Sequence, residues 1–484
     1  MLEKLDPILK FIPSIKKPDG PLGFKEKLKW TALIMTVYFL MFSIPAYGVN
    51  LVTVTSGIYQ LISIIFAARI GSLVTVGIGP IVLASILLQL LMGAGLINLD
   101  INNPEQKGRF QGIQKLTAII IAIIEAWIFA ATGYVPLINS SFFGIVVLQL
   151  ALGAIFVIFL DEMMTKYGIT SGINLFIAGG VAYAIIATTI SIIIPEAASA
   201  ISSGGAAAIP NAIMAFGPLF FAIIVFLISV YIYDIKVELP LAFSQFRGVG
   251  GRLPIPLLYV SVLPVILATS FVMSLDVWFR FLAGVSGSLA NLAKFIALYT
   301  PSNTGSAQLT GGLIYLISPI FPLPYATQGG VGNYATYFTL LLSQSSPLYL
   351  PWGGKPIPVP EWMHVIIYTV VLVLLCIVFG KFWVEMTGQS PKSVAEQLQE
   401  VGWQIPGFRR DPRIIESILN KYIPTITVIG SVIVGLLAAL ATLTGAVGTG
   451  MGILLTVGIM YMTYQQIEQE HLLEGYPALE KLLS

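Results

Sequence analysis

The chain is dominated by long runs of apolar residues, and these runs constrain its fold more than any other feature. A helix that crosses the hydrocarbon core of a bilayer needs about 20 mainly apolar residues. Such runs occur near positions 28–48, 73–97, 113–134, 141–161, 172–195, 210–233, 257–279, 362–385, 422–444 and 447–466. Hydrophobic residues make up 56% and charged residues 10% of the 484 positions, a balance that no single water-soluble core could bury. The sequence therefore predicts an all-α fold, a polytopic transmembrane helical bundle of ten spans.

Three further apolar stretches do not fit a membrane span. The stretch 56–68 is too short, and the stretches 281–300 and 311–325 are interrupted by Gly, Asn or Pro. We expect all three to be non-spanning.

The distribution of basic residues predicts the orientation of the spans, because loops rich in Lys and Arg stay in the cytoplasm. With ten spans and both termini cytoplasmic, nearly all of the 25 basic residues fall on the cytoplasmic side. The exceptions are Arg69, Arg280, Lys294 and Lys355. A reversed topology or a different number of spans would destroy this asymmetry.

Two long polar segments, 234–256 and 386–421, lie on the predicted cytoplasmic side, and each carries arginines near Gly and Pro turns. Exposed arginine loops are candidate docking surfaces, but the same residues also serve as positive-inside signals without any partner. The amphipathic N-terminal segment, residues 1–29, is compatible either with the membrane surface or with a disordered tail. No cleavable signal peptide is expected in it.

Few ionisable groups lie within the predicted spans. Glu125 is the clear case, and we expect it to face the bundle interior, since a carboxyl group is expensive in hydrocarbon. His364 lies at a predicted helix entrance, His471 lies in the C-terminal tail, and Cys376 is the only cysteine, so no metal site is expected. Phosphate-loop and hydrolase motifs are missing, which predicts a protein that is not an enzyme and needs no cofactor. A route lined by apolar groups favours a channel over a carrier.

Residues 56–97 contain a short apolar helix, then Arg69-Ile70-Gly71, then a longer helix with Gly77-Ile78-Gly79-Pro80 in its first turns. Such a break at membrane depth must be shielded by protein or line a cavity, which implies a re-entrant segment. Here the sequence resembles the SecY family, the pore subunit of the protein-conducting channel, and its archaeal members in particular. The matches run in order along the chain: FKEKLKW at 24–30, ARIGSLVTVGIGPIV at 68–82, FQGIQKL at 110–116, LDEMMTKYGITSGINLFIA at 160–178, LPVILA at 263–268, FWVEMTGQSPKSVA at 382–395, PGFRR at 406–410 and GMGILLTVGI at 450–459. The region 280–360 departs from the family by its length.

The resemblance implies two pseudo-symmetric five-helix halves around a central pore, residues 1–200 and 201–484. By the same resemblance, a ring of aliphatic residues closes the waist of the pore: Ile78, Val82, Ile173, Ile177, Ile266 and Leu455. A plug segment, 56–68, blocks the pore from outside and is represented by Ser56, Ile58, Leu61, Ile64, Ile65, Ala68 and the adjoining Arg69. A lateral gate towards lipid lies between the two spans that carry Pro80, Leu83, Leu87, Pro264 and Leu267. Read without the family, the ring residues would indicate ordinary helix packing.

The resemblance also implies a function and partners. The chain would translocate secretory proteins and release transmembrane segments into the lipid bilayer of the cell membrane, with both termini cytoplasmic. Arginine suits the recognition of ribosomal phosphate, so the predicted ribosome-docking residues are Arg247, Arg252, Arg409 and Arg410. The other implied partners are SecE-like and beta small membrane subunits, a signal recognition receptor, signal sequences and translocating polypeptides. The alternative is a secondary transporter of small solutes, which would share broken helices and internal pseudo-symmetry; a membrane-embedded enzyme is the third possibility.

Overall fold

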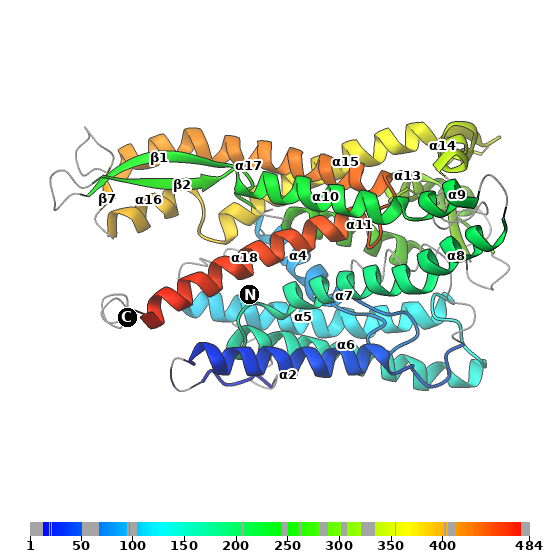
Figure 1. Ribbon diagram of the computed structural model, residues 1–484. Coiled ribbons are helices and arrows are strands. Elements are labelled where there is room, and N and C mark those ends of the chain that lie inside the picture. Colours follow the sequence, from blue (N-terminus) through cyan, green and yellow to red (C-terminus); the bar gives the residue numbers. More distant parts are fainter. Residues whose placement is uncertain are drawn as a thin grey trace.

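The computed structural model is almost entirely helical (Figure 1). It describes residues 13–18, 20, 22–50, 67–93, 96, 104–204, 208–243, 250–260, 263–280, 289–301, 307–320, 334–353, 355–400, 403–404 and 412–475. The elements up to residue 256 are α2 (Phe24–Ser43), α4 (Gly79–Gly93), α5 (Pro104–Ala131), η3 (Ser140–Phe142), α6 (Phe143–Tyr167), α7 (Gly172–Thr188), η4 (Thr189–Ile193), α8 (Ile194–Ser202), α9 (Ala208–Ala215), α10 (Gly217–Asp234), β1 (Lys236–Phe243) and β2 (Gly250–Pro256). The later elements are α11 (Leu263–Phe279), α12 (Ala290–Ile296), β3 (Leu298–Pro301), β4 (Ala307–Gly311), α13 (Leu313–Ile317), α14 (Tyr334–Ser343), β5 (Ser345–Leu348), β6 (Ile357–Pro360), α15 (Glu361–Met386), α16 (Pro391–Glu400), β7 (Trp403–Gln404), α17 (Pro412–Leu443) and α18 (Gly450–Gly475).

The long helices run side by side in two groups. Figure 1 shows α2, α5, α6 and α7 in one group and α10, α15 and α17 in the other, with α4, α11 and α18 between them. Helix α4 packs against α11, and α7 packs against α18, so helices from the first and second parts of the chain meet in the centre. We call the end that carries β1, β2 and α16 the hairpin end, and the end that carries α12 to α14 the opposite end.

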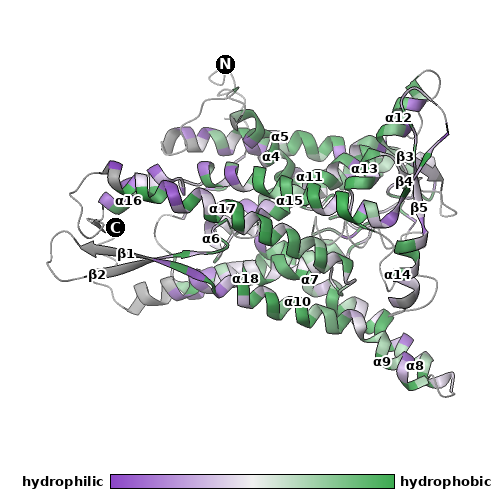
Figure 2. Cartoon of the chain, turned by 90° about the horizontal axis from the view of Figure 1, so that it is seen from above, coloured by the Kyte–Doolittle hydropathy of each residue, from purple (hydrophilic) through white to green (hydrophobic). Residues whose placement is uncertain are grey.

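The outer surface of the bundle is apolar. Figure 2 shows hydrophobic residues along the middle of the helices and hydrophilic residues gathered towards α16 and the hairpin. Six helical segments are long and apolar enough to cross a membrane, and α4 and α11 are shorter apolar helices. Each of the ten predicted spans overlaps one of the helices α2, α4, α5, α6, α7, α10, α11, α15, α17 and α18. The chain is a multi-pass membrane protein, and a count of ten spans fits this arrangement.

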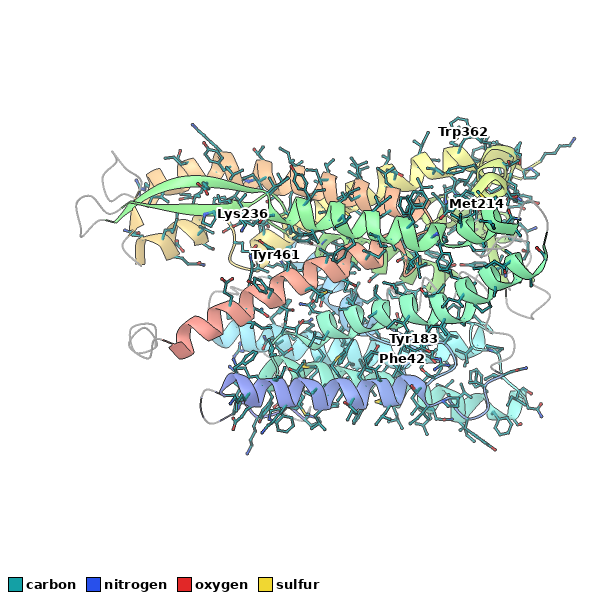
Figure 3. The ribbon with its side chains drawn as sticks, viewed as in Figure 1. Phe42, Tyr183, Met214, Lys236, Trp362 and Tyr461 are labelled. Atoms are coloured by element: carbon teal, nitrogen blue, oxygen red, sulfur yellow. The ribbon has the colours of Figure 1, made fainter. Side chains whose placement is uncertain are left out.

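Aromatic and cation–π contacts tie neighbouring elements together. Figure 3 shows Phe42 of α2 facing Tyr183 of α7, with ring centroids 5.0 Å apart in an edge-on arrangement. It also shows Lys236 of β1 beside Tyr461 of α18, where the ammonium lies 6.0 Å from the ring centroid. Such contacts stabilise helix packing beyond the area that they bury.

Prolines and glycines shift several helix ends from the predicted spans. The first span was predicted over 28–48, but α2 ends at Ser43, because Pro45 has no amide hydrogen and holds Ile44 in an extended conformation. Helix α11 begins at Leu263 rather than at 257, one residue before Pro264. The fifth span continues past the predicted residue 195 to Ser202 through the π-helical turn η4, which precedes Pro195 and accommodates its missing donor.

Glu125 lies on the inner face of α5, as predicted. Its side chain is 3% exposed, whereas Ile123, Ile124 and Trp127 on the other face of the same helix are exposed. The carboxyl group is therefore kept away from the apolar surface that meets lipid.

Part of the N-terminal segment packs on protein. Residues 13–16 are not helical and lie across the hairpin ends of α5 and α6. The amide of Ile15 donates to Glu162 over 3.1 Å, and the ammonium of Lys115 donates to the carbonyl of Pro13 over 2.6 Å. Lys115 and Lys166 both form ion pairs with Glu162, so one carboxylate joins both helices to this segment.

The region 280–360 forms a layer of short elements at the opposite end. Its described parts contain α12, α13 and α14 and two antiparallel strand pairs, β3–β4 and β5–β6, so the prediction of non-spanning segments is confirmed for these parts. His364 of α15 anchors this layer: its Nε2 lies 3.0 Å from the carbonyl oxygen of Ser318, and its Nδ1 lies 3.0 Å from Glu361. Glu361 also accepts a hydrogen bond from Tyr315 of α13. His364 thus has a structural role that its position in the sequence did not indicate.

Candidate functional site: an apolar constriction below a polar cavity

The chain between residues 67 and 78 runs through the middle of the protein without forming a helix. The sequence placed Gly77 to Pro80 within the first turns of a longer helix, and this prediction holds for Gly79 and Pro80 but is wrong for Gly77 and Ile78. Gly77 has a φ of +60°, which ends any regular helix there, and α4 starts only at Gly79. Backbone groups of this segment are bonded to protein: Ala46 donates to Gly71 over 2.8 Å, and Leu73 donates to Ile44 over 3.1 Å. The irregular backbone is therefore shielded, as a break at membrane depth requires.

The end of the predicted plug segment packs between α2 and α7. Most of that segment, including Ser56, Ile58, Leu61, Ile64 and Ile65, lies outside the described residues. Ala67 and Ala68 are buried, whereas the side chain of Arg69 is exposed. The hydroxyl of Tyr38 donates to the carbonyl of Ala67, and a side chain at Gly180 would meet Ala67 in ordinary van der Waals contact.

Helix α6 approaches this irregular segment closely at Gly153. A methyl group on Gly153 would lie 1.9 Å from the carbonyl oxygen of Leu73, which is a backbone atom and cannot swing aside. Only glycine permits this approach, so the position of the segment before α4 depends on it.

Gly153→Ala is expected to destabilise the protein by about 1–3 kcal/mol, because an atom forced into a well-packed site displaces its neighbours. The measurement is the thermal denaturation midpoint of the purified protein in detergent. Gly144→Ala in the same helix is the matched control, since nothing lies within 4 Å of its added methyl group. Equal midpoints for the two variants would contradict the close approach.

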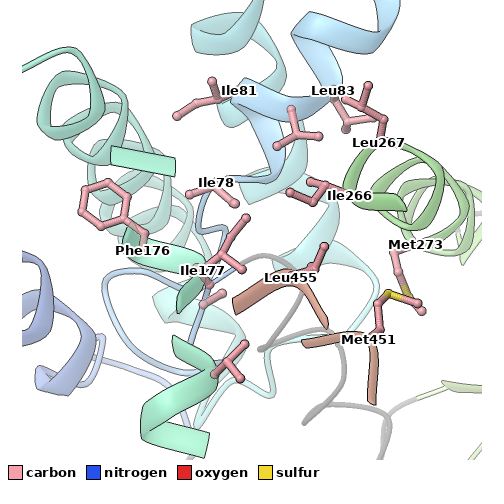
Figure 4. Close-up of a cluster of buried hydrophobic side chains, with 14 of the residues drawn as sticks. Ile78, Ile81, Leu83, Phe176, Ile177, Ile266, Leu267, Met273, Met451 and Leu455 are labelled. Carbon is pink, nitrogen blue, oxygen red and sulfur yellow. The ribbon is translucent and has the colours of Figure 1, made fainter. Parts of the chain in front are cut away.

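The six residues predicted to form the pore ring lie on the elements that meet in the centre. Ile78 precedes α4, Val82 lies in α4, Ile173 and Ile177 lie in α7, Ile266 lies in α11 and Leu455 lies in α18. Figure 4 shows Ile78, Ile177, Ile266 and Leu455 converging from these elements. All six belong to one apolar cluster, and of the six only Ile173 is partly exposed. The structure therefore brings them together; their role in sealing a pore remains a prediction.

Local hydrogen bonds position the helices that carry the ring. The amide of Ile173 donates to the Oδ1 of Asp161 in α6 over 2.9 Å, which fixes the start of α7. The hydroxyl of Thr449 accepts a hydrogen bond of 2.9 Å from Gly452 and caps the start of α18. A side chain at Gly450 would lie 2.1 Å from Ala441, so α18 can begin against α17 only with glycine there.

A cavity of about 1100 Å³ opens above the ring towards the hairpin end. Val82, Ile173 and Ile266 line it, whereas the other three ring residues do not. Its remaining walls mix apolar side chains, such as Phe110, Leu263 and Trp383, with polar ones. The polar side chains include Gln89, Gln111, Gln114, Asn174, Ser393, Glu396 and Gln397. A wide vestibule with many polar side chains thus borders the aliphatic ring.

The predicted lateral gate residues lie where α4 meets α11. Pro80, Leu83, Pro264 and Leu267 are buried, and Leu87 is partly buried. In Figure 4, Leu83 and Leu267 point towards one another across this contact. Each proline is the second residue of its helix, so both short helices begin in the same way. Beside this seam, the side-chain amide of Gln114 in α5 donates to the hydroxyl of Ser85 in α4 over 2.6 Å.

The two predicted arginine loops come together in one sheet. The segment 234–256 forms the hairpin β1–β2, and β7 from the segment 386–421 adds to the free edge of β1. Ala242 pairs with Gln404, and Phe243 pairs with Trp403. Arg252 lies in β2 opposite Pro240, while Arg247, Arg409 and Arg410 lie outside the described residues.

Comparison with known families decides the identity of this arrangement. The family model described as SecY matches residues 72–464, which include most of the irregular segment, the ring and both polar loops. The chain belongs to the SecY family. A curated relative, protein translocase subunit SecY of Methanococcus vannielii, is 39% identical over 483 residues and covers 99% of each chain.

Solved SecY-like structures have the same fold. A structure described as a protein conducting channel superposes with a TM-score of 0.78 at 36% identity and covers 98% of this chain and 99% of its own. A Sec61 channel from the canine ribosome–channel complex of the endoplasmic reticulum gives a TM-score of 0.76 at 35% identity, with the same coverage. The resemblance found in the sequence is confirmed at the level of the family.

Sequence reasoning missed the hairpin sheet and the buried charged pair at the carboxyl end of α11. The segment KVELPLAF at 236–243 carries the strand pattern of alternating polar and apolar residues, but this alternation is short and interrupted by proline. Asp276 and Arg280 stand four residues apart in the sequence, which is the spacing of a helical ion pair.

Proposed function

We propose that the chain is the pore-forming subunit of a protein-conducting channel, which passes secretory proteins across the membrane and releases transmembrane segments sideways into lipid. The observation that carries this proposal is the cluster of aliphatic ring residues, three of which line the large cavity, in a chain of the SecY family. The relatives are translocase subunits, so the alternative of a small-solute transporter is set aside.

The chemistry of the ring suits a polypeptide as cargo. Isoleucine, valine and leucine side chains have no hydrogen-bond donors or acceptors, so they hold no passing residue tightly. Branched apolar side chains also exclude water from a narrow passage and thereby block ions. The polar side chains of the vestibule, by contrast, offer hydrogen bonds to an unfolded chain before it reaches the ring.

Lateral release follows from the free energy of transfer. An apolar signal sequence gains favourable free energy on leaving the pore for lipid, whereas Lys, Arg or Asp costs about 2.5 to 3.5 kcal/mol at the centre of a helix. The contact between α4 and α11 is the seam for this exchange, because both helices carry cavity-lining residues and are short. Parting them would open the cavity towards lipid.

The hairpin end is the proposed cytoplasmic face of the cell membrane, with both termini on that side. It carries the sheet that joins the two arginine loops, and a ribosome is the proposed ligand of that sheet. A related Sec61 channel is described in a ribosome–channel complex. SecE-like and beta subunits and a signal recognition receptor complete the proposed set of partners, and elongation by the docked ribosome supplies the driving force.

The test is translocation by reconstituted protein. The chain with its small subunits is placed in liposomes and supplied with ribosomes that are translating a secreted precursor. Protection of the precursor from external protease, and its digestion after detergent is added, is the expected result. Liposomes that contain the complex but protect no more precursor than empty liposomes would overturn the proposal.

Deleting residues 56–66 is expected to raise the resting ion leak of the reconstituted channel severalfold, because the proposed plug would no longer cover the ring. The deletion stops before Ala67, so the packed contact with Tyr38 is retained. Single-channel conductance in a planar bilayer provides the measurement. An unchanged resting current would count against a plug in this segment.

A further inference from the structure

The end of α11 at the opposite end of the bundle holds a charged pair away from water. Arg280 follows the last residue of α11 and is 3% exposed, and Asp276, one turn earlier, is 5% exposed. The Nη2 of Arg280 lies 3.2 Å from the Oδ2 of Asp276. The guanidinium also lies at the carboxyl end of the helix, where a positive charge is favoured. Buried charges of this kind need further partners close by.

Tyr299 of β3 supplies one such partner from the same part of the chain. Its hydroxyl lies 2.9 Å from the Oδ1 and 2.8 Å from the carbonyl oxygen of Asp276, and its ring centroid lies 5.7 Å from the Cζ of Arg280. Leu275 and Phe279 of α11 pack on the apolar cluster beneath β3, β4 and α13. The end of α11 and the layer of short elements therefore form one packed unit.

Tyr134 supplies a second partner, and it comes from the other part of the chain. Its ring centroid lies 4.9 Å from the Cζ of Arg280, and its side chain is fully buried. The ring also packs on Phe129 at the end of α5, with centroids 4.6 Å apart. The loop that carries Tyr134 is held to the first part of the chain, since Ile138 donates to the carbonyl of Gly48 over 2.9 Å.

We propose that Arg280 and Tyr134 form a latch that positions α11 against the first half of the chain, and that the strength of this latch sets how apolar a signal sequence must be to part α4 from α11. The inference rests on the proposed function. The pair with Asp276 and the bonds from Tyr299 travel with α11 when the seam opens, whereas the contact with Tyr134 crosses the two halves and breaks. A guanidinium over a tyrosine face is strongest where water is excluded, as it is here.

The test compares two precursors, one with an intact signal sequence and one in which two leucines of the signal are replaced by alanine. The measured quantity is the ratio of weakened to intact precursor translocated by reconstituted complex. Tyr134→Leu, which removes the aromatic face, is expected to raise this ratio roughly tenfold. Tyr134→Phe keeps the aromatic face and is expected to leave the ratio at the wild-type value.

Tyr299→Phe keeps the test decisive if Tyr134→Leu does not fold. It removes one oxygen atom and loosens Asp276 and Arg280, so a smaller rise in the same ratio is expected. If Tyr134→Leu folds, an unchanged ratio would overturn the latch, and so would equal ratios for Tyr134→Leu and Tyr134→Phe. If Tyr134→Leu does not fold, an unchanged ratio in Tyr299→Phe would overturn it. Failure of the wild-type complex to translocate the intact precursor would instead overturn the proposed function.

Discussion

Replacing Ile177 by serine is expected to raise the resting ion conductance of the reconstituted channel about tenfold, which corresponds to a barrier lowered by about 1.4 kcal/mol. Ile177 is fully buried in the apolar cluster that holds the ring residues, and its replacement leaves a polar group and a gap there. Water can then enter the constriction, and ions can follow. The measurement is single-channel current in a planar bilayer without a translocating chain.

Ile186→Ser provides the matched control, because Ile186 lies in the same helix but is 59% exposed on its outer face. The same chemical change there should leave the current unchanged. Equal currents for the two variants, either both raised or both at the wild-type level, would contradict a seal at the ring.

Arg409→Glu is expected to weaken ribosome binding about tenfold at low salt, with a further loss when Arg247→Glu is added, because charge reversal replaces attraction to phosphate by repulsion. The sheet that joins β1 and β7 brings the two arginine segments to the same end of the bundle, so their effects should combine. Co-sedimentation of detergent-purified complex with ribosomes measures the affinity.

Lys355→Glu is the control for this charge reversal, since Lys355 is exposed at the opposite end. It should leave binding unchanged at the same ionic strength. Binding that is insensitive to Arg409→Glu, or that falls equally with Lys355→Glu, would remove the docking proposal.

The positions of the long helices could be predicted because bilayer thickness fixes the length of an apolar run. The middle of each helix was therefore located well, whereas its ends were not. Pro45 ends α2 before the predicted residue 48. Pro195 does not end the fifth span, because the π-helical turn before it accommodates its missing hydrogen-bond donor. Whether a proline ends a helix depends on the hydrogen-bond partners around it, and these are set by tertiary structure.

The site could be predicted only in part, and for a similar reason. The ring residues are aliphatic in a chain rich in aliphatic residues, so their type alone did not distinguish Ile177 from Ile186. The resemblance to a family identified them, and the structure places them in one apolar cluster at the centre of the bundle. The contact of Arg280 with Tyr134 joins residues that are 146 positions apart in the sequence, and no local sequence pattern predicts such a contact.

Crosslinking from the ring to a polypeptide in transit tests the central claim most directly. A photoreactive amino acid is placed at Ile78 or Ile266, and at the outward-facing Leu148 as a control. Ribosomes stalled on a secreted precursor are then bound to the reconstituted complex and irradiated. Adducts between precursor and both ring positions, and none from Leu148, are the predicted result. Absence of adducts at Ile78 and Ile266, while the precursor is bound, would contradict a protein-conducting pore at this constriction.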